Sequence, residues 1–449
     1  MNWSARSLAC AVVAALAGCG GGTSASPALP AGGSPPPVKS VVTPLKHIVV
    51  IVQENRSFDN FFAGYPGADA PTFGYTHTGA KVRLKQITFW PAAGLDHLWK
   101  AGIGDWANGK MNGFDLPGIG RQLPPLYMYS FVKRAQVQPY WDMAGQYVLA
   151  DHMFPTEFGP SFTAHQNLIA GSTEIKPGFS VINLPTLDGL QQRGDCDAEK
   201  GTTTDLINTQ REVLKHAGPP PCFTYPSMAD AMDPANVSWK YYSGFWPSGN
   251  STWDAFGAIK KVRYGPDWTR NVTTKNGEIL KDAPSGNLPA ISWVIPTPKD
   301  SDHPGTGSDT GPSWVAAVVN AIGEGPDWDS TAIIVVWDDW GGWYDDAKPP
   351  QLDYRGLGIR VPCMIISPYA KTHYVDHTQY EFGSILKTME EVFGMESIGT
   401  TDVRSQDMLG AFDFKQQPRA FKKIASKYPP SHFKNEARSK LLIPDPGDE

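Results

Sequence analysis

The sequence predicts an α/β fold, with a largely parallel central sheet covered by helices on both faces and long loop insertions. Residues 45–53 and 331–337 are apolar runs rich in β-branched residues, as in strands buried on both faces. Residues 313–322 and 384–393 have the apolar spacing of helices. Strands that alternate with helices favour a parallel sheet.

The individual elements have further local signals. Ser313 is a candidate N-cap for the first of these helices, and residues 359–367 are a third candidate strand. Gly and Pro account for 45 and 40 of the 449 residues, roughly 19% together, which exceeds the ~12% usual in globular chains. This excess indicates long ordered loops, and residues 176–289 are expected to be a loop-rich insertion.

The composition excludes several classes of protein. The chain has 39 Lys and Arg against 45 Asp and Glu, a net charge of −6, whereas nucleic-acid binding needs a basic face. Hydrophobic residues make up 41% of the chain, enough to exclude general disorder. The sequence lacks the Gly-x-Ser-x-Gly, His-Glu-x-x-His, P-loop and dinucleotide-binding motifs. A calcium loop beginning at Asp300 fails because its twelfth position is Gly311.

The N-terminus predicts export. Arg6 precedes an apolar run, 8–17, of the length of a secretory signal and too short to span a bilayer. The run ends in Leu-Ala-Gly-Cys, which resembles the bacterial lipobox, so residues 1–18 are expected to be removed and Cys19 acylated. Residues 19–44 have the Gly/Ser/Pro-rich composition of a tether. We expect a protein lipid-anchored in the bacterial envelope; an ordinary secretory signal is the alternative.

Residues 45–449 are expected to form a single catalytic domain. Its Cys196 and Cys222 lie in a polar loop region and could form a disulfide in an oxidising compartment. Cys363 lies inside an apolar run and is expected to be buried.

Acids and an amide follow the two clearest strands. Glu54 and Asn55 come directly after the first, and Asp338 and Asp339 after the second. Ligands of parallel sheets bind beyond the carboxyl ends of the strands, and oxygen ligands suit Mg, Ca, Mn or Zn. The alternative is that these side chains only cap strand ends and loops.

A serine follows a break in the chain. Pro160 precedes Ser161, and the next residues can begin a helix, so Ser161 could lie at a helix N-terminus, which favours anions. Near a divalent cation such a serine can be deprotonated and attack phosphorus. An N-cap role alone is the alternative.

Five sequence blocks occur in the order typical of one family. They are Glu54-Asn55-Arg56-Ser57-Phe58-Asp59, Asp96-His97 with the later Asn112-Gly113-Phe114, Gly159-Pro160-Ser161, Asp302-His303-Pro304, and Asp338-Asp339-Trp340-Gly341-Gly342-Trp343-Tyr344-Asp345. Together they resemble the bacterial phosphoesterase family that contains acid phosphatases and non-haemolytic phospholipases C, within the alkaline phosphatase superfamily. The resemblance implies an alkaline phosphatase-like fold and hydrolysis of phosphate esters.

The resemblance also implies residue roles. The metal ligands would be Glu54, Asn55, Asp338 and Asp339. Ser161 would be the nucleophile that becomes transiently phosphorylated. His97 and His303 would contact the phosphoryl oxygens, to which Asn55 could also donate.

The sequence departs from the family at several positions. Trp340 and Asp346 stand where many phospholipase-like members have histidines, so one divalent cation is expected. His377 could compensate, or be a surface-loop histidine. His165, four residues after Ser161, lies on the same face if the segment is helical, and packing and catalytic roles both remain open.

Three functions are compatible with these patterns. We favour a phosphomonoesterase because the phospholipase-like histidines are replaced. A phospholipase C that cleaves phospholipid head groups is the alternative, with the aromatic stretch 239–246 as a candidate groove lining or a loop-ordering segment. A non-catalytic, envelope-anchored module that binds glycans or lipids through aromatic residues is the third.

Overall fold

The computed structural model describes residues 1, 40–90, 92–116, 123–244, 251–434 and 436. Apart from Met1, the expected signal peptide lies outside the described residues, as do the Cys19 lipidation site and residues 19–39 of the tether. Within the described part of the chain, no helix has both the length and the apolar character needed to cross a membrane.

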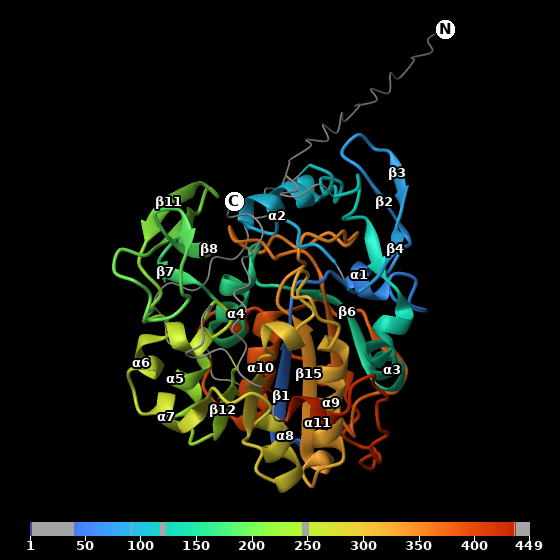
Figure 1. Cartoon of the computed structure of the whole chain (residues 1–449), viewed down its shortest axis with the longest axis vertical. Helices are drawn as coiled ribbons and strands as arrows, with labels where there is room; N and C mark the ends of the chain where they lie inside the picture. Colours follow the sequence, from blue (N-terminus) through green and yellow to red (C-terminus); the bar gives the residue numbers. More distant parts are fainter. Residues whose placement is uncertain (2–39, 91, 117–122, 245–250, 435, 437–449) are drawn as a thin grey trace.

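A nine-stranded sheet forms the centre of the molecule (Figure 1). Its path runs β13-β12-β14-β1-β15-β16-β6-β17, and β18 also pairs with β6. The strands are β1 (His47–Gln53), β6 (Val148–Phe154), β12 (Trp239–Tyr242), β13 (Val272–Thr273), β14 (Ile291–Val294), β15 (Thr331–Trp337), β16 (Val361–Ile366), β17 (Tyr374–Asp376) and β18 (Tyr380–Glu381).

The sheet is largely parallel, which confirms the predicted fold class. Strand β1 pairs in parallel with both β14 and β15, and only β16 runs against its two neighbours, β15 and β6. The chain passes from β15 to β16 through residues 338–360 without a crossover helix, and such a connection returns the chain antiparallel. Because β6 is antiparallel to β16, it points the same way as β1 and β15.

Helices pack on either side of the central strands (Figure 1). Helix α4 (Ser161–Ala170) contacts α10 (Phe382–Phe393), while α9 (Gly311–Gly323) contacts α3 (Gln138–Gln146), α8 (Ile279–Asp282) and α11 (Pro430–Phe433). Two helix starts differ from expectation. Thr310 is the N-cap of α9, so Ser313 lies inside the helix, and α10 begins at Phe382 because Glu381 and Ser384 form a capping box.

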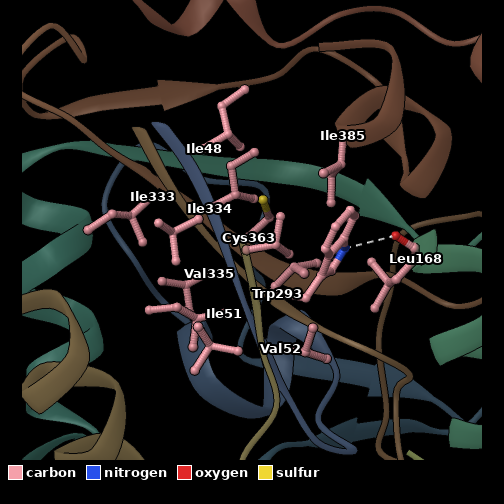
Figure 2. Packing of buried hydrophobic residues seen from close by; sticks show 14 of the residues in the cluster. Ile48, Ile51, Val52, Leu168, Trp293, Ile333, Ile334, Val335, Cys363 and Ile385 are labelled. Carbon is pink, nitrogen blue, oxygen red and sulfur yellow. Dashed lines mark hydrogen bonds between the residues drawn. The ribbon is translucent and has the colours of Figure 1, made fainter. Parts of the chain in front are cut away.

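The core joins the sheet to α4 and α10. Figure 2 shows side chains of β1, β15 and β16 packed together with Leu168 of α4 and Ile385 of α10. The Trp293 indole nitrogen donates to the Leu168 carbonyl at 3.2 Å (Figure 2). This bond ties α4 to strand β14. Cys363 is fully buried, as expected.

The region 176–289 is more regular than the loop-rich insertion expected. A five-stranded antiparallel sheet contains β7 (Glu174–Lys176), β8 (Phe179–Leu187), β9 (Leu190–Gln191), β10 (Thr203–Asn208) and β11 (Val213–Gly218). Strands β12 and β13 of the same region extend the main sheet. Cys196 and Cys222 form a disulfide, as the sequence suggested.

The remaining elements are short. They are α1 (Phe58–Phe62), β2 (Phe73–Tyr75), β3 (Lys81–Arg83), β4 (Lys85–Ile87), α2 (Trp99–Trp106), β5 (Ser130–Val132), α5 (Met228–Met232), α6 (Lys260–Arg263) and α7 (Asp267–Asn271).

A buried carboxyl on α10 makes stability depend on pH. Burial raises the pKa of Glu390 from its ordinary 4.5 to about 9, and the nearby Asp402 carboxylate adds to the increase. The folded protein therefore holds a proton that the unfolded chain releases at lower pH. The contribution of Glu390 to the free energy of unfolding is at its full value below pH 4.5 and is lost as the pH rises towards about 9.

We predict that Glu390→Gln, which cannot ionise, is more stable than the wild type at pH 8, with a difference that shrinks towards pH 5. The change should not exceed about 1.4 kcal/mol per pH unit. Urea denaturation across this range measures it, with the exposed Glu396→Gln as control. A Glu390→Gln advantage that is independent of pH would contradict the assignment.

Candidate active site

Two loops that carry acids meet where β1 and β15 end. The backbone N–H of Asn55 donates to Asp338 Oδ1 at 3.0 Å, and Asn55 adopts a left-handed φ of 57°. Gly341 closes the second loop: a Cβ there would lie 2.2 Å from the Asn55 carbonyl oxygen, and its N–H donates to Asp339 Oδ1 at 2.7 Å. Glycine is required at this close approach.

Ser161 lies against both loops. It is the first residue of α4 and is fully buried. Its Oγ lies 3.3 Å from Asp339 Oδ2 and 3.4 Å from Asn55 Oδ1. Pro160 occupies the N-cap position, so Ser161 does not serve as the cap. The sequence prediction that Ser161 begins a helix is confirmed.

Two histidines approach this group. His97 Nε2 lies 2.9 Å from Asn55 Nδ2, and its ring centre is 6.2 Å from that of His303. The Nδ1 atoms of His97 and His303 lie 2.7 Å and 2.6 Å from the carbonyl oxygens of Leu95 and Pro304. Since a carbonyl only accepts, we assign a proton to each Nδ1. Each Nε2 is then the nitrogen that can gain or lose a proton.

His165 joins the predicted metal ligands. Its Nε2 lies 2.7 Å from Glu54 Oε1 and 3.7 Å from Asp338 Oδ2, and all three side chains are buried. One ligand atom from each lies within 4.8 Å of the others. The sequence left packing and catalysis open for this residue; the structure places it beside two acids, and its ring also stacks on that of Trp253, with 6.2 Å between ring centres.

The donor set fits a metal ion. Asp338 Oδ2 is buried and has no hydrogen-bond partner among the described residues, a cost that a cation would offset. Glu54, Asp338 and His165 offer two carboxylates and an imidazole, and Asp339 and Asn55 lie beside them. This combination of oxygen and nitrogen ligands could bind a metal ion.

A buried layer supports His303. Asp302 accepts from Tyr140 Oη at 2.7 Å and from the Trp337 indole at 3.0 Å. Burial raises the pKa of Asp302 to about 7, although these donors and Arg56 oppose the increase. Arg56 Nε donates to the Asp302 carbonyl at 3.0 Å, and burial lowers the pKa of Arg56 to about 10. The loop after β1, which carries Arg56, is therefore hydrogen-bonded to the loop that carries His303.

Trp340 and Asp346, which replace histidines of the family, and His377, which could compensate for them, all have other partners. Trp340 donates its indole N–H to Asp105 at 3.0 Å, and its ring is nearly perpendicular to that of His97, with 6.2 Å between ring centres. Asp346 pairs with Arg360 at 3.0 Å. His377 contacts Asp151 of β6 at 2.9 Å, and β6 lies three strands from β1, or about 14 Å. The structure does not bring His377 to Ser161.

Arg360 holds the segments around the site together. It is fully buried and pairs with Asp345 at 2.9 Å and Asp59 at 3.3 Å as well as with Asp346. It also donates to the Asp151 carbonyl at 3.0 Å. Burial opposes its charge, but the three carboxylates raise the pKa of Arg360 above its ordinary value, so the guanidinium stays charged. The sequence reasoning missed this residue, whose only signal is an arginine in front of an apolar strand.

Comparison with known proteins gives a consistent family. The model of the family described as the Phosphoesterase family matches residues 45–396. The chain is similar to phospholipase C B of Mycobacterium tuberculosis, with 25% identity over 86% of this chain and 81% of the relative. It is similar to the non-hemolytic phospholipase C of Pseudomonas aeruginosa, with 23% identity over 82% of this chain and 57% of the relative. Non-specific phospholipase C4 of Arabidopsis thaliana is 23% identical over 79% of this chain and 69% of the relative.

Among solved structures, an alkaline phosphatase superfamily protein from Vibrio parahaemolyticus matches with a TM-score of 0.38 and 11% identity. The match covers 84% of this chain and 72% of that one.

We predict that Arg360→Met lowers the free energy of unfolding by about 3–5 kcal/mol, because it leaves buried carboxylates without their cation. Lys423→Met, which removes an exposed ion pair with Glu324, should cost less than about 1 kcal/mol. Urea denaturation at neutral pH compares the two variants. Equal losses would mean that the buried carboxylates do not depend on Arg360.

Proposed function

The chain belongs to the phosphoesterase family, and from this premise we propose that it hydrolyses phosphate monoesters through a phosphorylated Ser161, with one divalent cation. The family makes it a phosphoester hydrolase, which removes the non-catalytic binding module as a candidate. The observation that supports the proposal most directly is the buried Ser161 Oγ between Asn55 and Asp339, with His97 alongside.

Ser161 is suited to carry a phosphoryl group. It occupies the first position of a ten-residue helix, so the free backbone N–H groups and the helix dipole favour negative charge there. In the proposed first step Ser161 Oγ forms a bond to phosphorus while the bond to the leaving oxygen breaks. The alcohol leaves with a proton, and water then cleaves the Ser161 ester and releases phosphate.

The cation would be held by Glu54, Asn55, Asp338 and Asp339, with His165 as a further ligand. When bound it would supply positive charge that favours the Ser161 alkoxide and offsets charge on the phosphoryl oxygens. Two positions that are often histidine in phospholipase-like members are Trp340 and Asp346 here. We propose one cation because both side chains have other partners. Trp340 bonds Asp105, and Asp346 bonds Arg360.

His97 and His303 would act through Nε2. With Nδ1 protonated in both rings, His97 Nε2 accepts from Asn55 Nδ2. Once the Asn55 amide donates to a phosphoryl oxygen instead, a second proton on Nε2 would make each ring a cation that can also donate to a phosphoryl oxygen. The same proton can be passed to the leaving alcohol. Asn55 Nδ2, which points at His97 Nε2, would be a third donor.

Three donors favour a monoester. A monoester has three non-bridging phosphoryl oxygens, whereas a diester has two, so Asn55, His97 and His303 together match the monoester better.

Phospholipase C activity is the second candidate, and the names of the similar proteins favour it. The aromatic stretch 239–246 does not support a lipid groove, because residues 239–242 form β12 and are buried or half-buried in the main sheet. Phe245 and Trp246 lie outside the described residues.

We also propose that the protein is exported and anchored to the envelope through acylated Cys19. The apolar run and the lipobox-like end support this, and the Cys196–Cys222 disulfide suits an oxidising compartment. The substrate would be a small phosphate ester or a phospholipid, and the acidic net charge argues against nucleic acid.

We predict that Ser161→Ala lowers kcat/KM for an aryl phosphate at least about 1,000-fold, because it removes the nucleophile. Exposed Ser285→Ala should retain wild-type activity. A chelator should inactivate the wild type, and added Mg²⁺, Ca²⁺, Mn²⁺ or Zn²⁺ should restore it.

Head-group release from phosphatidylcholine, assayed in parallel, decides the ester class. Faster hydrolysis of the lipid than of the aryl phosphate would replace the monoesterase by a phospholipase C. If the wild type hydrolyses neither with metals supplied, the proposed function is wrong. If the Ser161→Ala variant retains activity, only the assignment of Ser161 as the nucleophile is wrong.

We predict that His165→Ala raises the cation concentration needed for half-maximal activity about 10-fold or more, since a ligand of the cation is lost. Activity at saturating cation should fall less. His216→Ala, at an exposed position, is the control. An unchanged cation requirement in His165→Ala would assign the residue to packing.

A further inference from the structure

A second group of metal-ligating side chains lies at β6, away from Ser161. It consists of Asp151 and His152 of β6 and His377, which follows β17. One ligand atom from each lies within 4.8 Å of the others. The Asp151 carboxylate is fully buried, while the side chains of His152 and His377 are 29% and 60% exposed. The group is thus anchored inside the sheet and open to solvent on the histidine side.

Two imidazole nitrogens converge on the one carboxylate. His152 Nδ1 lies 2.8 Å from Asp151 Oδ1, and His377 Nδ1 lies 3.0 Å from the same oxygen and 2.9 Å from Oδ2. A neutral nitrogen without a proton would repel the carboxylate at these distances. Either each Nδ1 carries a proton or a cation lies between the nitrogens and the oxygen.

The surroundings of His152 are acidic, which favours a cation beside it. Its other nitrogen, Nε2, lies 4.0 Å from Asp69 Oδ2, an ion-pair distance that is too long for a hydrogen bond. Two acids, Asp69 and Asp151, therefore flank this imidazole. The Asp69 backbone N–H donates to Asp151 Oδ2 at 2.9 Å, which orients the carboxylate.

We propose that Asp151, His152 and His377 form a second metal site that takes Zn²⁺ or a similar transition-metal ion. Two imidazoles and a carboxylate are ligands typical of Zn²⁺, whereas Mg²⁺ and Ca²⁺ prefer oxygen alone. Water would complete the coordination.

The ion would stabilise the edge of the sheet. Strand β17 has only three residues and pairs with β6 near Asp151: Asp376 is opposite Ala150. Binding of the ion would link His377, in the turn after β17, to β6 at the point where the pairing of β17 with β6 ends. Because β6 precedes Ser161 in the chain, the ion would also stabilise the strand that leads to the proposed nucleophile. The proposed metal site does not depend on the proposed phosphatase activity.

The test counts zinc on the full chain. Wild type, His377→Ala and His77→Ala are freed of metal with a chelator, dialysed against Zn²⁺, and analysed for bound zinc per chain. His77 is the matched control, because it is an exposed histidine 2.7 Å from one carboxylate, Asp115, without a second imidazole in that pair. His377→Ala should bind one zinc fewer than the wild type, and His77→Ala should match the wild type.

Thermal unfolding provides a second readout. Zn²⁺ should raise the Tm of the wild type more than that of His377→Ala, while the two should agree in chelator. His152→Ala should repeat the loss of one zinc. Equal zinc content in the wild type and His377→Ala would overturn the site. If the cation proposed beside Ser161 is wrong instead, the wild type binds one zinc and His377→Ala none.

Discussion

The parallel pairing of β1 with β15 is the constraint on which the site depends. The ladder runs in register from His47 opposite Thr331 to Gln53 opposite Trp337, so both chains leave the sheet at the same level. The next residues are therefore neighbours, and Asp338 Oδ1 accepts from the Asn55 backbone. Both strands are almost entirely buried, and a shift of one residue would turn every apolar side chain to the opposite face. Core packing thus sets the positions of the acids.

A second constraint acts through charge. Arg360 sits among Asp59, Asp345 and Asp346, each of which lies a few residues beyond a site loop, and it also reaches the β6 backbone. An arginine in this setting supplies the charge that an acidic triad would otherwise take from a cation. The triad is therefore structural, although its geometry alone resembles a metal site. The same segments carry stability and chemistry.

The substituted histidine positions show how one family can differ in its sites. Trp340 fills its position with an indole that packs beside His97 and bonds Asp105, and Asp346 is neutralised by Arg360. Neither leaves a ligand for a second cation beside Ser161. By contrast, histidines gather at β6, where the sheet edge needs support. The proposed second metal site on β6 thus lies three strand positions from β1, whose end carries Glu54 and Asn55.

The sequence by itself determined the fold class, the central strands, the start of α4 at Ser161 and the acids at the strand ends, because these follow from patterns within a few consecutive residues. The two predicted helix starts were wrong by two residues. Helix α9 begins earlier, with Pro312 in its first turn, and α10 begins at the capping box of Glu381 and Ser384, neither of which follows from the apolar pattern. Only the tertiary structure decided that His165 meets Glu54, that His377 meets Asp151 and that Arg360 joins three segments. Each of these contacts joins residues more than ten positions apart, and which faces meet is settled by packing.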